Sequence, residues 1–205
     1  LFLDDLWKEF DQARHSEQAL RNLQQQMSEL RFMDPACGCG NFLMVSYREL
    51  RKLEHKILIR IEELRGERDQ RVTAEKILSG KKGRSRSSGR RAGQQVTSVA
   101  DLSLLSPAQF FGIEILEFPA RIAETGMYLI DHLANLELSA TFGVHLTKFP
   151  ITEEATIEIG NALRLSWDAV VPADQCDYVF GNPPFAGRGT RTSAQSDDLK
   201  EVWGA

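Results

Sequence analysis

Two short polar segments, each following an apolar run, hold residue types that suit ligand binding and group transfer. Residues 34–42, DPACGCGNF, combine an acid with glycines that permit a tight turn and let a ligand approach the backbone closely. The helical pattern that follows has an N-terminus that favours negative charge, such as a carboxylate. Residues 182–185, NPPF, fix an extended turn with hydrogen-bond acceptors beside a flat ring. This turn suits the amino edge of a planar base, and a polar loop with a buried aromatic anchor is an equal interpretation of it alone.

Two further residues follow apolar runs and suit a nucleoside. Glu114 lies in the run 110–115, and an acid at the tip of a strand can accept hydrogen bonds from both hydroxyls of a ribose. Asn161 follows the run 156–159, and its amide can bond the edge of an adenine ring. Taken singly, the first is an ordinary strand-end acid and the second a turn residue. The G-x-G spacing at 38–40 lacks the third glycine of a dinucleotide site, which disfavours a nicotinamide or flavin cofactor.

Alternating helix and strand patterns position these residues, each at the end of a strand. Helices are predicted over 3–30, 41–78 and 119–135, the last with Pro119 in its first turn, and strands over 30–33, 110–115, 156–159 and 177–180. This alternation indicates an α/β fold with a parallel sheet. Residues 186–198 are predicted to be a polar loop, followed by a short helix.

Composition narrows the class of protein. With 205 residues, 42% of them hydrophobic, the chain can form one domain with a buried core. A formal net charge of −4 argues against a uniformly basic nucleic-acid-binding domain, although basic residues gather in segment 81–91. The Gly-, Ser- and Arg-rich segment 79–95 is predicted to be a flexible, solvated insert.

Other classes of site are disfavoured. Three cysteines are too few for a disulfide framework and indicate a reducing compartment, so the cytoplasm is the expected location. No apolar run approaches the roughly 18 residues of a membrane span, and the first ten residues have acids where a signal peptide needs basic residues. No metal site is expected, because Cys37 and Cys39 have no second close pair and the histidines are scattered.

The four motifs together resemble those of the S-adenosylmethionine-dependent DNA adenine-N6 methyltransferases. The matching strings are DPACGCGNF, then GIEI at 112–115, GNAL at 160–163 and FGNPPF at 180–185. The segment 127–139, MYLIDHLANLELS, also resembles sequences of the large methyltransferases that are fused in type IIG-like restriction-modification enzymes. The resemblance runs from about residue 31 to the C-terminus.

The resemblance implies a fold and a role for each motif residue. The fold is a partial Rossmann-like, class I methyltransferase sheet with helices on both faces, in which 1–30 is a helical lead-in and 31–205 the cofactor-binding part of the domain. S-adenosylmethionine is the implied cofactor and double-stranded DNA with a flipped adenine the implied partner. The implied cofactor contacts are Asp34, Ala36, Gly38, Gly40, Asn41, Glu114, Ile115, Asn161 and Ala162. The implied catalytic turn is Asn182, Pro183, Pro184 and Phe185.

The chain also departs from the family pattern. Cys39 stands where the family usually has Ser, and Asn161 where Asp is more frequent. The family sheet has seven strands and is joined to a target-recognition domain, whereas four strands can be placed here, so we expect the chain to be truncated. Two alternatives stay open: an N-P-P-[FY] methyltransferase that acts on RNA or on a protein glutamine, and an inactive methyltransferase remnant.

Overall fold

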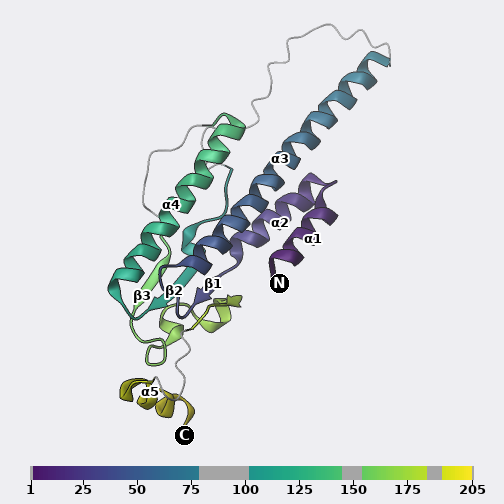
Figure 1. Ribbon diagram of the computed structural model, residues 1–205. Helices are drawn as coiled ribbons and strands as arrows, with labels where there is room; N and C mark the ends of the chain where they lie inside the picture. The colour runs from purple at the N-terminus through teal and green to yellow at the C-terminus, as the bar shows by residue number, and fades with distance from the viewer. Residues whose placement is uncertain (1, 79–101, 145–153, 184–190, 205) are drawn as a thin grey trace.

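A computed structural model describes residues 2–78, 102–144, 154–183 and 191–204, and in them the strands form one parallel sheet in the order β3-β2-β1-β4 (Figure 1). The strands are β1 (Phe32–Asp34), β2 (Phe110–Glu114), β3 (Thr156–Ile159) and β4 (Tyr178–Val179). Each lies within two residues of its predicted bounds. Asp34 pairs with Gly112 and Glu114 with Ile159, so the carboxyl ends of the strands share one edge. The predicted α/β class and parallel sheet are confirmed.

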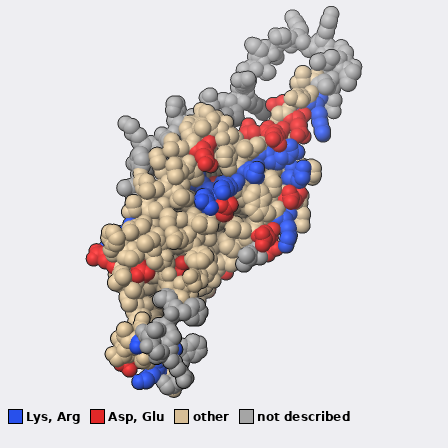
Figure 2. Space-filling model, in the orientation of Figure 1, with Lys and Arg blue, Asp and Glu red and all other residues tan. Residues whose placement is uncertain are grey.

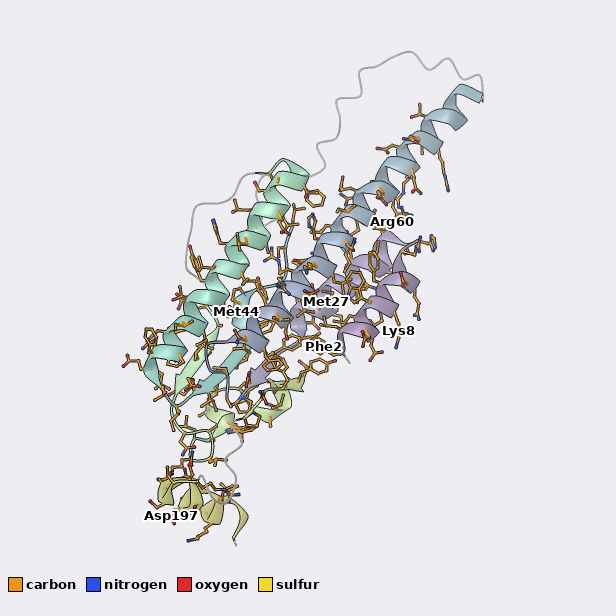
Figure 3. The ribbon with its side chains drawn as sticks, in the orientation of Figure 1. Phe2, Lys8, Met27, Met44, Arg60 and Asp197 are labelled. Carbon is orange, nitrogen blue, oxygen red and sulfur yellow. The ribbon has the colours of Figure 1, made fainter. Side chains whose placement is uncertain are left out.

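Helices surround this sheet. The α-helices of the described residues are α1 (Phe2–Ala13), α2 (Glu17–Glu29), α3 (Asn41–Leu78), α4 (Glu117–Phe142) and α5 (Ser193–Trp203). Short 3-10 helices lie at η2 (Pro107–Gln109), η3 (Trp167–Ala169) and η4 (Ala173–Gln175). The chain between β2 and β3 packs α4 against α3, with Met44 of α3 lying against Gly126 of α4 (Figure 3). The predicted helix over 41–78 is confirmed.

The two faces of the sheet are covered differently. Side chains alternate between faces along a strand, so Phe32 and Phe110 face the core formed with α1 to α4, where their rings stack at 4.8 Å. Met33 and Ile113 face the other side, where they pack with Val171. The long helices of the described residues therefore lie on one face. The segment that carries η3 and η4 covers the other.

The lead-in is not one helix, as predicted for 3–30, but two packed helices. The helix is interrupted before Ser16, whose hydroxyl caps α2 by accepting from the Ala19 N–H at 3.3 Å. The turn is then held to α3 by Arg60, whose Nε donates to the Arg14 carbonyl at 2.8 Å (Figure 3). Phe2 reaches the sheet, with its ring 4.8 Å from that of Tyr178. The expected helical lead-in thus shares the core of the sheet.

Two other helix boundaries differ from the prediction. Helix α4 begins at Glu117 and extends to Phe142, with Pro119 in its first turn. The predicted polar loop 186–198 is wrong from residue 193 onward, because α5 begins there. Thr192 and Gln195 form a capping box at its start. The predicted insert 79–95 lies outside the described residues.

The outer part of α3 projects beyond the other helices (Figure 1). Where α3 passes the turn between α1 and α2, acidic and basic side chains lie close together, with Arg60 2.8 Å from Glu63 and Arg65 2.8 Å from Glu62 (Figure 2). Pairs at this spacing lie on neighbouring turns of a helix. They give this part of α3 a charged surface.

A buried polar cluster joins α3 to the segment that leads into β2. Glu54 is fully buried, and its Oε1 accepts from the Leu104 N–H at 2.7 Å and from Gln24 Nε2 at 2.9 Å. Its Oε2 accepts from the Ser103 hydroxyl at 2.7 Å and lies 3.3 Å from Arg51 Nε. This carboxylate therefore holds α2, α3 and the entry to β2 together.

Replacing Glu54 by Ala should lower the free energy of unfolding by about 3 kcal/mol, because buried Arg51 loses one of its two carboxylate partners and the Leu104 N–H loses its acceptor. The matched control is Glu62→Ala, an exposed pair on the same helix, which should change it by less than about 1 kcal/mol. Urea unfolding of both variants measures the difference. Equal losses of unfolding free energy in the two variants would show that the buried cluster contributes no more to stability than an exposed ion pair.

Candidate functional site

The candidate site lies at the carboxyl edge of the sheet, where the ends of β1, β2 and β4 meet. The Phe180 N–H donates to the Met33 carbonyl at 2.9 Å, which carries the pairing of β4 with β1 up to that edge. The Gly160 N–H donates to the Glu114 carbonyl at 2.9 Å, which does the same for β3 and β2. The residues of the four predicted motifs that the structure describes therefore lie at the same edge of the sheet, where the strands end.

The glycine turn after β1 lies against the end of β2. The Cys37 N–H donates to the Ile113 carbonyl at 3.0 Å, and the Gly38 N–H donates to Glu114 Oε2 at 3.0 Å. Gly40 has a φ of +81°, and a Cβ on it would lie 2.8 Å from Ala123 Cβ of α4. A side chain is excluded there on both grounds. The turn can therefore run close between β2 and α4 into the start of α3 at Asn41.

The carboxylate of Glu114 is fixed in direction but retains free acceptor capacity. Its Oε2 accepts from Gly38, and its Oε1 accepts from the Leu116 N–H at 2.9 Å. A carboxylate offers about four lone-pair positions, so roughly two remain for a ligand. Ile115 beside it is 61% exposed, which leaves an apolar surface next to these acceptors.

Asp34 is the most buried acid of the site, with 1% of its surface exposed. Its Oδ1 accepts from the Ala36 N–H at 3.0 Å, whereas its buried Oδ2 has no hydrogen-bond partner among the described residues. Burial, together with the nearby Glu114 carboxylate, raises the pKa of Asp34 above its ordinary value. An unpartnered buried carboxylate oxygen is a place for a cationic donor.

The end of β4 brings the NPPF turn next to Asp34. Gly181 approaches so closely that a Cβ on it would collide with Asp34 Oδ1. Asn182 and Pro183 follow directly and are exposed. The predicted catalytic residues Pro184 and Phe185 lie outside the described residues. The start of the NPPF turn therefore lies beside Asp34, the residue from which the glycine turn leaves β1.

Asn161 lies at the end of β3, and its amide already has two partners. Its Oδ1 accepts from the Leu163 N–H at 3.0 Å, and its Nδ2 donates to Asp198 Oδ2 of α5 at 2.8 Å. Ala162 packs on the second face of the sheet. Asp198 was not among the predicted site residues, because no sequence motif includes it. The capping box at Thr192 indicates a helix there but assigns no role to its residues.

In the described part of the chain, the His, Cys, Asp and Glu side chains form no cluster of three or more that could hold a metal ion. None of its helices combines the length and the apolar character needed to span a bilayer.

Comparisons with known proteins agree on one family. The family model for the MmeI DNA-methyltransferase domain matches residues 10–205. DNA methyltransferase A of Bacillus subtilis (strain 168) is 31% identical over 207 residues, which cover 100% of this chain and 20% of that protein. The structure of the Type IIL restriction-modification enzyme MmeI in complex with DNA superposes with a TM-score of 0.80 at 37% identity. It covers 100% of this chain, which spans 24% of the MmeI chain.

The raised pKa of Asp34 predicts a pH-dependent stability. Because the folded-state pKa exceeds the unfolded one, ionised Asp34 costs stability at all pH values above the folded pKa, and the cost vanishes below about pH 4. Asp34→Asn should therefore be more stable than the wild type at pH 7, with a gain that shrinks as the pH falls.

Urea midpoints at pH 7 and at acidic pH measure this gain. Asp174→Asn, at an exposed acid, is the control and should leave stability unchanged at both pH values. A destabilised Asp34→Asn variant at pH 7 would contradict the account of an electrostatic cost at this position.

Proposed function

This chain belongs to the family of the MmeI DNA-methyltransferase domain, and from that premise we propose that its protein methylates the N6 amino group of adenine in double-stranded DNA. S-adenosylmethionine is the proposed methyl donor. The observation that carries the proposal is the convergence of Asp34, Glu114 and the start of the NPPF turn at one edge of the sheet. Related proteins in restriction-modification systems give the proposed biological context, with the cytoplasm as its place.

The residues present fit this cofactor. Glu114 has acceptor capacity for the two ribose hydroxyls, and exposed Ile115 offers apolar contact to the adenine ring. The unpartnered Asp34 Oδ2 suits the positively charged amino group of the methionine part. Gly38 and Gly40, both with positive φ, keep the turn free of side chains beside it, and Ala36 and Asn41 complete the proposed loop. When bound, the cofactor supplies a methyl group activated by its positively charged sulfur.

The proposed catalytic work of the protein is to prepare the adenine amino group. Its lone pair is delocalised into the ring, which makes it a poor nucleophile. Hydrogen bonds from this group to the Asn182 side-chain oxygen and to the Pro183 carbonyl draw the nitrogen toward tetrahedral geometry and localise the lone pair. Placement and electrostatics then lower the barrier, and no strong base is needed. The adenine must first leave the duplex stack, with Phe185 as its proposed stacking partner.

The cofactor assignment predicts that Glu114→Gln weakens binding of S-adenosylmethionine about tenfold, because one acceptor oxygen becomes a donor. Isothermal titration of the full-length protein measures the affinity. Glu117→Gln is the matched control, since this exposed acid lies three residues further along the chain, at the start of α4. An unchanged affinity in Glu114→Gln would show that the ribose does not bind this carboxylate.

The methyl-transfer assignment predicts that Asn182→Ala slows labelling of adenine in duplex DNA by about 100-fold or more, with little change in cofactor affinity. The assay follows a labelled methyl group from S-adenosylmethionine into N6-methyladenine. Asn22→Ala, at an exposed residue of α2, is the control.

The same assay separates the two alternatives. Label in RNA or in a glutamine peptide, with none in duplex DNA, would replace the proposed substrate by one of these. A protein that binds the cofactor but transfers no methyl to any of the three would be an inactive remnant.

A further inference from the structure

Helix α5 contacts the proposed adenine-binding residue through one carboxylate. Asp198 is 7% exposed, and its Oδ2 accepts from Asn161 Nδ2 at 2.8 Å. Its Oδ1 accepts from Arg164 Nε at 2.7 Å, so both of its oxygens are engaged. Asp197, one residue earlier, is by contrast exposed and pairs with Lys200 at 3.5 Å (Figure 3). Asp198 is thus a buried carboxylate with both oxygens hydrogen-bonded, on a helix whose other side chains are mostly exposed.

The two partners of Asn161 fix which way its amide points. The Leu163 N–H requires an acceptor and Asp198 requires a donor, so Oδ1 must face the first and Nδ2 the second. Turning the amide over would place two donors against each other on one side and two acceptors on the other. The second lone pair of Oδ1 remains available in the observed orientation.

We propose that Asp198 is a positioning residue that holds Asn161 with its oxygen, rather than its NH2 group, toward the amino group of the cofactor's adenine. This inference rests on the proposed function, in which Asn161 meets that amino group. An oxygen accepts from the amino group of adenine, whereas an NH2 group repels it. Asp198 therefore sets the preference for adenine over a ring that carries an oxygen at the same place.

The chain offers a charge-reversal test of this arrangement. Asn161→Asp places a second carboxylate against Asp198, which is unfavourable at this distance. Adding Asp198→Asn restores one donor and one acceptor across the contact, now in reverse order, while residue 161 still presents an oxygen. The double variant lacks the Asp198–Arg164 ion pair, so it separates orientation of residue 161 from docking of α5.

The experiment measures binding of S-adenosylhomocysteine and S-inosylhomocysteine by the full-length protein. The two ligands differ at the ring position that Asn161 faces. We expect the wild type to prefer the adenosyl ligand by about tenfold or more. Asp198→Ala should lower this ratio toward unity, because only the Leu163 N–H then sets the direction of the Asn161 amide. Asp197→Ala is the matched control on the same helix and should keep the wild-type ratio.

The double variant gives the decisive comparison. We expect Asn161→Asp alone to weaken binding, and Asn161→Asp with Asp198→Asn to recover a ratio within about threefold of the wild type. If α5 has a purely structural role, Asp198→Ala should weaken the binding of both ligands equally. The double variant should then not recover the wild-type ratio. Either result overturns the inference. A wild type that binds neither ligand refutes the proposed function, and this inference with it. A wild type that binds both ligands equally refutes the inference alone.

Discussion

The carboxylate of Asp34 is buried where β1, β2 and β4 end, and a buried carboxylate is costly unless its oxygens are satisfied. One oxygen is satisfied by the first backbone N–H of the glycine turn, which ties the turn to the strand. The other is buried and has no hydrogen-bond partner among the described residues. The absence of a side chain at Gly181 follows from this placement, since a Cβ there would strike the carboxylate. The buried, unpartnered oxygen thus carries an electrostatic cost in the fold, at the position where we propose that the amino group of the cofactor binds.

The layer of helices keeps this junction in register. Glu54 holds the segment before β2 against α3, and Tyr47 donates to Asp131 of α4 at 2.6 Å, so α3 and α4 cannot slide independently. The strands that they support carry Asp34 and Glu114. The buried cluster is therefore part of the helical layer that packs on the strands carrying Asp34 and Glu114.

Much of this architecture could be predicted because strand ends and glycine turns leave local signals. The glycine turn, Glu114 and the NPPF turn were each expected at a strand end, and the expected family is confirmed by the comparisons. The break at Ser16 was missed because the apolar spacing continues across it. Asp198 was missed for a different reason: its contact to Asn161 spans 37 positions of sequence and depends on tertiary packing. Such a contact has no local pattern.

The central claim, that this edge of the sheet binds the adenosyl cofactor, is tested most directly by a crystal structure of the full-length protein with S-adenosylhomocysteine. The account predicts that the ribose hydroxyls bond to the carboxylate of Glu114 and that the ligand's amino group bonds to Asp34 Oδ2. The adenine ring should then lie toward Asn161. A ligand bound elsewhere, or one that leaves Asp34 Oδ2 without a partner, would contradict it.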